Sequence, residues 1–212
     1  MPEGASIDAV FFDIGNVLLR FDMRAMAAKL AWAVRRHPIR VMRRLLDAAM
    51  LGRIERGELS GAQIYALFQS EFGYSGSYDA FIRIWCDHFS LERANYALLR
   101  QLSRSRRVYL LSNTNALHYE FIRGRYAFPR QVDGAVLSYQ LGLRKPQPAI
   151  YEAAVALAGS PPERCLFIDD LAENVAAARR CGLNAIHHVP GRDLRAAVGR
   201  LGLLGPELKS EA

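Results

Sequence analysis

Three apolar runs in this chain each end in side chains that can do chemistry. Residues 9–12 lead into Asp13, residues 108–111 into Ser112 and Asn113, and residues 165–168 into Asp169 and Asp170. Apolar runs of this length that stop at polar residues are typical of buried parallel strands, whose carboxyl ends meet at one edge of a sheet. We therefore expect the three strand ends to form one site.

Adjacent carboxylates at the end of a buried strand need compensation. Asp169 and Asp170 repel each other and lose hydration, so they require a cation or several hydrogen-bond donors nearby. A hard divalent cation with oxygen ligands, Mg²⁺ above all, meets that need. The alternative is structural, since Asp13 could cap a turn and Asp169-Asp170 could cap the following helix. Because three strand ends carry such residues, we favour a functional site over three separate caps.

Lys145 supplies the opposite charge. It could neutralise Asp13 and a substrate anion as a compact point charge, while Pro146 stiffens the loop that carries it. A Lys-Pro pair on its own is more typical of a surface loop. The prediction for Lys145 therefore depends on the carboxylates at the strand ends.

The elements that must position these residues alternate between strand and helix. Strands are expected at 9–13, 108–113, 135–138, 165–170 and 184–189, with helices at 92–103, 116–123, 148–158, 172–181 and 192–200. Gly182 is a typical stop after the helix at 172–181. The pattern predicts an α/β fold with a Rossmann-like, doubly wound parallel sheet and right-handed crossovers.

A helical insertion separates the first strand from the rest. Residues 22–50 have a helical pattern with Asp22 as N-cap and a break at His37-Pro38, residues 52–60 resemble a loop, and amphipathic helices are expected at 61–72 and 78–89. We see no strand pattern between residues 20 and 90. The prediction is a core domain of residues 1–19 and 91–212 with a small inserted cap of residues 20–90.

Length and composition restrict the class of protein. The chain has 212 residues, of which 51% are apolar, enough for one core and a small insertion. We find no apolar run long enough to cross a bilayer and no secretory pattern at the N-terminus. The three widely spaced cysteines suit reduced thiols, so a cytoplasmic protein is expected.

The formal net charge of +7 raises the question of nucleic-acid binding. Many basic residues fall in one helical stretch, residues 24–44, without the interleaved aromatic side chains of a single-strand binding surface. We interpret this stretch as a solvated helix face whose field attracts anionic substrates. We expect no nucleic-acid or membrane partner, and the expected state is a monomer or homodimer.

Four motifs in this order resemble those of the haloacid dehalogenase-like hydrolase superfamily. They are Phe12-Asp13-Ile14-Gly15-Asn16-Val17-Leu18, Leu111-Ser112-Asn113-Thr114-Asn115, Leu143-Arg144-Lys145-Pro146, and Phe167-Ile168-Asp169-Asp170 with Asn174. The first motif is most similar to that of bacterial sugar-phosphate phosphatases of the α-D-glucose-1-phosphate phosphatase type. Residues 55–60 resemble a segment of the helical cap in those enzymes.

The resemblance implies a Mg²⁺-dependent phosphatase acting on a sugar phosphate. Asp13 would be the nucleophile that forms an aspartyl phosphate. The implied metal ligands are Asp13, the Gly15 carbonyl and Asp170, with Asp169 acting indirectly. Phosphate oxygens would be bound by Ser112, the Asn113 N–H and the amides of Ile14, Gly15 and Asn16. Lys145 would balance charge and orient the nucleophile, and Asn174 would orient Asp170 from one helical turn away.

One position departs from the pattern of most phosphatases in the superfamily. They carry a second Asp two residues after the nucleophile, as general acid and base, where this chain has Gly15. Such a group contributes roughly 10²–10⁴-fold in rate. Substrates with a good leaving group, such as glycosyl phosphates, would lose least. His118 could substitute, although a histidine on the helix surface is the simpler interpretation.

The missing acid leaves two other functions open. Haloacid dehalogenases of this fold also lack the second Asp, but they use no metal and their fourth motif carries Ser and Asn instead of Asp169-Asp170. A non-catalytic binding module is the other alternative. Within the cap, Arg53, Glu55 and Arg56 could face the substrate, and both tryptophans, Trp32 and Trp85, are expected in the cap core.

Overall fold

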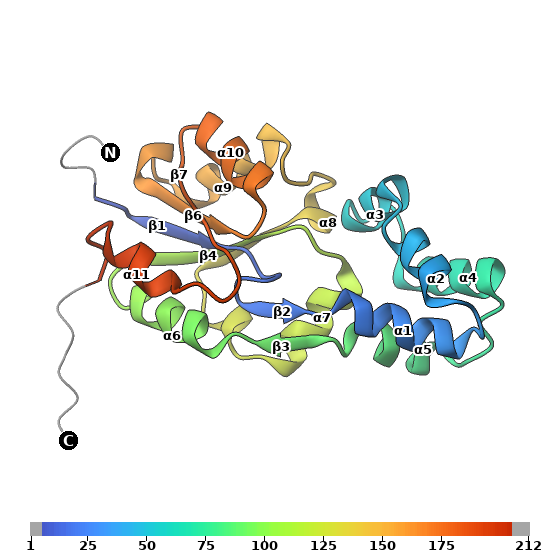
Figure 1. Ribbon diagram of the computed structural model, residues 1–212. Helices are drawn as coiled ribbons and strands as arrows, with labels where there is room; N and C mark the ends of the chain where they lie inside the picture. The colour runs from blue at the N-terminus through green and yellow to red at the C-terminus, as the bar shows by residue number, and fades with distance from the viewer. Residues whose placement is uncertain (1–5, 205–212) are drawn as a thin grey trace, which may run out of the picture.

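A five-stranded parallel sheet forms the centre of the molecule in the computed structural model, which describes residues 6–204 (Figure 1). Its strand order is β5-β4-β1-β6-β7, with every neighbouring pair parallel. The strands are β1 (Ala9–Phe12), β4 (Arg107–Ser112), β5 (Gly134–Leu137), β6 (Cys165–Asp169) and β7 (Asn184–His187). The predicted α/β fold and its five strands are confirmed.

Helices cover both faces of this sheet because its strands are apolar on both sides. Val10 and Phe12 pack with α6 (Arg93–Leu102), α7 (Ala116–Arg125) and α11 (Leu194–Gly199). Ala9 and Phe11 point the other way and pack with α9 (Pro148–Ala158) and α10 (Ala172–Arg180). Alternate residues of one buried strand thus serve two cores, which is the doubly wound arrangement. Short helices are α8 (Ser138–Leu141) and the 3₁₀ turns η1 (Phe128–Arg130) and η2 (Pro162–Arg164).

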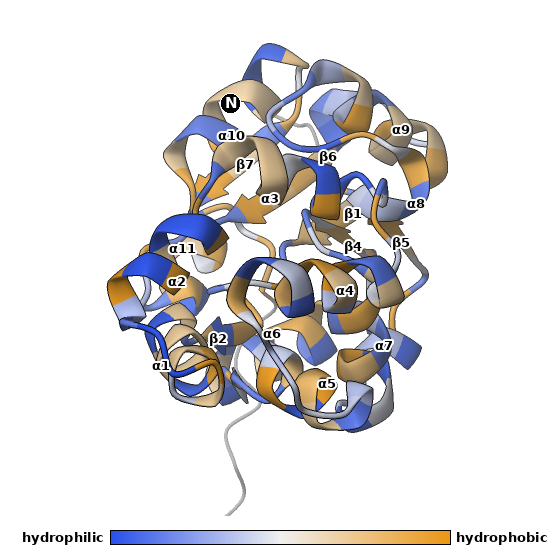
Figure 2. Ribbon diagram, turned by 90° about the vertical axis from the view of Figure 1, so that its right-hand side faces the viewer, coloured by the Kyte–Doolittle hydropathy of each residue, from blue (hydrophilic) through white to orange (hydrophobic). Residues whose placement is uncertain are grey.

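The cap helices pack around an apolar cluster of their own, at the right of Figure 1. They are α1 (Met23–Ala33), α2 (Pro38–Leu45), α3 (Ala48–Glu55), α4 (Gly61–Phe72) and α5 (Tyr78–Cys86). Figure 2, which looks at the molecule from the cap side, shows hydrophobic and hydrophilic turns alternating along these helices. Side-chain caps fix their starts: Asp22 accepts a hydrogen bond from the Ala25 N–H at 2.9 Å, as predicted for an N-cap.

Two predictions for the cap are wrong. Residues 52–60 are not all loop, because α3 continues to Glu55; the Asp47 side chain caps this helix, and Met50 and Ile54 bury its inner face. The insertion also contains strands, β2 (Leu19–Phe21) and β3 (Phe89–Leu91), which pair antiparallel. Three residues are too few for a visible alternation, so the sequence pattern missed them. The two predicted domain boundaries, 19/20 and 90/91, fall within β2 and β3. The division into core and cap domains stays a prediction.

The two tryptophans differ from each other. Trp85 is buried in the cap core, as predicted, but Trp32 is 86% exposed on α1 and the prediction for it is wrong. Helical position decides this: Leu30 and Ala31 occupy the inner face of α1, and the next residue turns away from it. The three cysteines are free thiols. Among residues 6–204 no helix is both long and apolar enough to cross a bilayer.

Candidate active site

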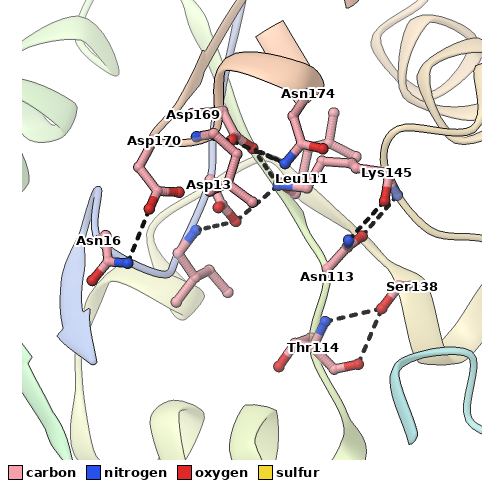
Figure 3. A network of polar contacts seen from close by, with 12 residues as sticks. Asp13, Asn16, Leu111, Asn113, Thr114, Ser138, Lys145, Asp169, Asp170 and Asn174 are labelled. Atoms are coloured by element: carbon pink, nitrogen blue, oxygen red, sulfur yellow. Dashed lines mark hydrogen bonds and ion pairs between the residues drawn. The ribbon is translucent and has the colours of Figure 1, made fainter. Parts of the chain in front are cut away.

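The polar strand ends meet at one edge of the sheet, as predicted (Figure 3). Asp13 follows β1, Ser112 ends β4, and Asp169 ends β6 with Asp170 next to it. Since β1 lies between β4 and β6, Asp13 occupies the middle of the group. Ser112 and Asp169 are almost completely buried, and Asp13 keeps only 7% of its surface exposed.

Lys145 lies between two of these carboxylates. Its Nζ is 3.0 Å from Oδ1 of Asp13 and 2.6 Å from Oδ2 of Asp169, and it donates to the Leu111 carbonyl oxygen at 3.0 Å. Burial alone would lower the pKa of this ammonium group, but the two carboxylates outweigh it and raise the pKa above its ordinary value. Lys145 is therefore a permanent buried cation.

Asn113 holds the Lys145 loop in place. Its Oδ1 accepts from the Lys145 N–H at 2.8 Å, and its Nδ2 donates to the Lys145 carbonyl at 2.9 Å. This reciprocal pair joins the end of β4 to the loop, so the position of the ammonium group is fixed at its backbone. Both polar atoms of the Asn113 side chain are used in this pair. Phosphate binding by the Asn113 backbone N–H stays a prediction.

Asp13 has the electrostatic environment of a reactive carboxylate. Burial raises the pKa of Asp13 to about 7, with Asp169 and Asp170 adding to the rise, while Lys145 and the Ser112 hydroxyl lower it. The Ile14 N–H donates to Oδ1 at 2.7 Å and orients the group. A cation beside Asp13 would favour its ionised form.

Asp169 is held by hydrogen bonds on both oxygens. Oδ1 accepts from the Leu171 N–H at 2.8 Å, Oδ2 accepts from Lys145, and Asn174 Nδ2 lies 3.0 and 3.1 Å from the two oxygens. Asn174 thus orients Asp169, and the prediction that it orients Asp170 is wrong. Adjacent residues at a strand end point in different directions, so the helix that follows can reach only one of the two.

Asp170 is less buried and retains free oxygen lone pairs. Its Oδ2 accepts from Nδ2 of Asn16 at 2.9 Å. Burial raises the pKa of Asp170, with Asp169 contributing in the same direction, while Asn16 and Lys145 lower it. One carboxylate oxygen each of Asp13, Asp169 and Asp170 lies within 4.8 Å of the others. An all-oxygen donor set of this kind fits Mg²⁺.

A cavity of about 440 Å³ extends from these carboxylates toward the cap. Its core wall includes Asp13, Gly15, Ser112 and Asp170. Apart from its two chain neighbours, no heavy atom of residues 6–204 lies within 4 Å of a Cβ placed at Gly15. The structure therefore leaves room at the position where most related phosphatases carry their acid, and fills it with no other side chain.

His118 also lines the cavity, but its environment differs from both interpretations of the sequence. The ring is partly buried and stacks on Trp85, with centroids 5.6 Å apart. Burial lowers the pKa of His118 to about 4. Nε2 lies 3.1 Å from the Trp85 carbonyl oxygen and Nδ1 lies 3.2 Å from Asn115 Nδ2. This network assigns a neutral ring that donates to Trp85 and accepts from Asn115, so no proton is directed at a substrate.

Only one of the three cap residues expected near the substrate lines the cavity. Glu55 does so, with Oε2 2.7 Å from Nη2 of Arg144, while Arg53 and Arg56 lie outside the cavity wall and pair with Glu58. Burial raises the pKa of Glu55 despite the lowering effect of Arg144. The role of Arg144 could not be predicted from the sequence, because nothing in the spacing links it to Glu55, 89 positions earlier.

Ser138 is a second residue that the sequence analysis missed. It is fully buried at the start of α8, where its Oγ accepts from the Thr114 N–H at 2.9 Å and donates to the Thr114 carbonyl at 3.0 Å. These bonds fix the segment that follows Ser112 and Asn113. A serine at the end of a predicted strand was the available signal.

The arrangement of these residues matches a known family. The family model for haloacid dehalogenase-like hydrolases matches residues 7–182. This chain belongs to that family. The four motifs of the sequence analysis lie within the matched region, and a hydrolase is therefore established as the class of enzyme.

This hydrolase is similar to two curated phosphatases and to a solved structure of the same family. A D-ribitol-5-phosphate phosphatase of Bacteroides thetaiotaomicron is 27% identical over 199 residues, which are 89% of this chain and 95% of that protein. A sesquiterpene phosphatase of Aspergillus oryzae is 26% identical over 145 residues, 68% of this chain and 74% of that one. A haloacid dehalogenase family enzyme of Bacteroides thetaiotaomicron, crystallised with magnesium and inorganic phosphate, has a TM-score of 0.81 at 24% identity, covering 91% and 99% of the two chains; it shows the same fold.

Proposed function

We propose that this hydrolase is a Mg²⁺-dependent phosphatase that cleaves the phosphate monoester of a small metabolite through an aspartyl phosphate on Asp13. One observation carries the proposal: carboxylate oxygens of Asp13, Asp169 and Asp170 lie within 4.8 Å of one another beside a buried cation, Lys145, and Asp13 and Asp170 line the cavity. Phosphoryl transfer needs neutralised oxygens and in-line positioning more than other machinery, and this group supplies both.

The donor set indicates how the metal would be held. Asp13 and Asp170 would bind it through carboxylate oxygens, and the Gly15 carbonyl would add a third protein ligand. Asp169 is engaged in hydrogen bonds on both oxygens, so it would act by holding Lys145 and the neighbouring backbone. Bound magnesium would neutralise the phosphate oxygens and keep Asp13 ionised.

The chain's own residues would carry the two steps. An oxygen of Asp13 attacks phosphorus, the bond from phosphorus to the alcohol oxygen breaks, and the alcohol takes a proton from water. Ser112 and the N–H groups of Asn113 and Gly15 bind the phosphate oxygens. The predicted phosphate contacts of the Ile14 and Asn16 amides are not available, because the Ile14 N–H donates to Oδ1 of Asp13 and the Asn16 N–H donates to the Leu19 carbonyl oxygen. A water molecule then attacks phosphorus, releases inorganic phosphate and restores the carboxylate of Asp13.

The curated relatives differ in the organic part of their substrates. The sequence analysis predicts a sugar phosphate, and the ribitol-phosphate relative supports a polyhydroxylated alcohol. The sesquiterpene phosphatase supports a very different one. These names agree on a phosphatase and disagree on the alcohol, so a sugar phosphate is one proposal among at least two.

A phosphate-release assay with p-nitrophenyl phosphate tests the function. Activity should require Mg²⁺, disappear with EDTA and return when Mg²⁺ is added in excess. Asp13→Asn should lower kcat by at least about 10³-fold because the amide is a poor nucleophile. Asp87→Asn, which changes an exposed aspartate of the cap, is the matched control and should retain full activity.

Two outcomes would contradict the proposal. Phosphate release that is insensitive to EDTA would show that the reaction does not depend on Mg²⁺. Normal turnover by a folded Asp13→Asn variant would show that Asp13 is not the nucleophile. Halide release from 2-haloacids in EDTA would identify the metal-free dehalogenase instead. Circular dichroism of each variant separates loss of chemistry from loss of fold.

A further inference from the structure

The cap side of the cavity is almost entirely apolar. Of the ten residues between positions 21 and 89 that line it, nine are hydrophobic and Glu55 is the exception. They come from β2, α1, α2, α3, α5 and β3, and Met23, Met26, Met50, Leu51 and Ile54 are typical of them. Aliphatic and thioether side chains of this kind offer no hydrogen bonds to a ligand.

Few polar groups near this wall are left to bind a ligand. Glu55 is paired with Arg144, and His118 uses both ring nitrogens on Trp85 and Asn115. Two N–H groups, Trp85 Nε1 and Arg144 Nε, lack an acceptor within the described part of the chain, and both atoms are buried. A polyol placed here would lose hydration at each hydroxyl without gaining a protein partner for most of them.

We propose that the alcohol part of the substrate is a hydrocarbon group, which lies against α1 and α3 while the phosphate lies at Asp13. This inference rests on the proposed phosphatase function and narrows its substrate class. An apolar group gains from leaving water, by roughly fourfold in affinity for each buried methylene. The cavity volume of about 440 Å³ lies within the ordinary range for small-molecule sites.

A matched pair of substrates tests this directly. The compounds n-pentyl phosphate and ribitol 5-phosphate both have five carbons and a primary alcohol as leaving group, so they differ chiefly in hydroxyl content. We expect kcat/KM to be at least about tenfold higher for n-pentyl phosphate and to rise further from pentyl to octyl. The aromatic ester 1-naphthyl phosphate distinguishes a flat ring from an alkyl chain as the preferred hydrocarbon.

The outcomes separate the two proposals. If p-nitrophenyl phosphate is hydrolysed but ribitol 5-phosphate is preferred over n-pentyl phosphate, the hydrocarbon inference is wrong and the phosphatase stands. If no ester is hydrolysed, the function is wrong; binding of octyl phosphate and ribitol 5-phosphate, measured by calorimetry on the unmodified protein, then still decides between an apolar and a polar ligand.

Variants of the cavity wall supply the second test. Leu51→Asn and Met23→Gln preserve size at half-buried positions and place an amide in the wall. Each should raise KM for octyl phosphate by roughly tenfold while the inhibition constant of inorganic phosphate stays within about twofold. Leu46→Asn makes the same change at a 56% exposed leucine outside the cavity wall and should alter neither value. Equal effects of Leu51→Asn and Leu46→Asn would overturn the inference.

Discussion

Gly15 is the residue at which this site differs most from a complete phosphatase. Its backbone is not in the left-handed region, and a Cβ there would meet nothing within 4 Å. The position therefore tolerates a side chain, so the absence of an acid is a property of the sequence and is not forced by the fold. His118 does not replace it, because the ring is neutral and both its nitrogens are engaged.

Gly15→Asp should consequently give a gain of function. For alcohols that are poor leaving groups we expect kcat to rise by roughly 10–10²-fold, a part of the usual contribution of a general acid. For p-nitrophenyl phosphate, whose leaving group needs no proton, kcat should change by less than about threefold. Steady-state kinetics with a series of aryl and alkyl phosphates checks this, and Gly15→Asn controls for the added bulk. A uniform change across the series would contradict the assignment.

The identities of the residues at the sheet edge were predictable, but their pairings were not. Asp13, Ser112 and Asp169 could be read from the sequence because each ends an apolar run, and parallel strands bring such ends together. The partner of Asn174 depends on the direction of two adjacent side chains, which spacing along a helix does not encode. Burial of His118 likewise arises from contact with the cap, a long-range property.

At the scale of elements, α7 of the core meets α5 of the cap at His118. The ring donates to the Trp85 carbonyl and stacks on its indole, so this junction depends on an uncharged imidazole. The pKa of His118 is about 4 in the folded protein, against an ordinary value of 6.5. Protonation therefore favours the unfolded chain, and the stabilisation is complete above pH 6.5 and is lost as the pH falls toward 4.

The free energy of unfolding should thus decrease between pH 6.5 and 4.5 more steeply in the parent protein than in His118→Gln. The glutamine amide can still donate to Trp85 but does not titrate in this range. The difference between the two curves should reach at most about 3 kcal/mol. Urea denaturation at half-unit steps of pH measures it, and parallel curves for the two proteins would show that His118 is not responsible.

Longer elements were predicted better than shorter ones. The central strands and α9 followed from apolar runs and from periodicity, and α9 has the predicted bounds Pro148–Ala158. The pair β2 and β3 was missed because its three-residue strands are stabilised by pairing across seventy residues, as between Phe21 and Phe89. Local pattern carries no information about such a partner.

At the scale of the whole molecule, positive charge is densest on one part of the cap, since residues 23–46 contain seven Lys and Arg and no Asp or Glu. Exposed basic residues lie along α1, α2 and the turn between them, among them Arg24, Lys29, Arg36, Arg40 and Arg43. The same two helices contribute Met23 and Leu45 to the cavity wall. The positive field of these helices is therefore adjacent to the cavity and should attract dianionic phosphates.

Salt should weaken this attraction. We expect kcat/KM for a phosphate ester to fall several-fold between about 20 mM and 300 mM NaCl while kcat stays nearly constant, because screening acts on encounter. Reversing Arg36, Arg40 and Arg43 to Glu should lower kcat/KM at low salt and flatten this dependence. The same reversal at Arg93, Arg100 and Arg104, exposed on or just after the core helix α6, is the control for net charge. Identical behaviour of both triple variants would contradict steering by the cap.

The pairing of β2 with β3 has one more consequence. Leu19 is opposite Leu91 and Phe21 is opposite Phe89, so the chain leaves the core and returns to it at the same place. Topologically the whole set of cap helices is the loop of a single β-hairpin. Lengthening, shortening or exchanging that loop leaves the order of the core strands untouched, so the cap wall of the cavity can change while the carboxylates at the sheet edge stay in place.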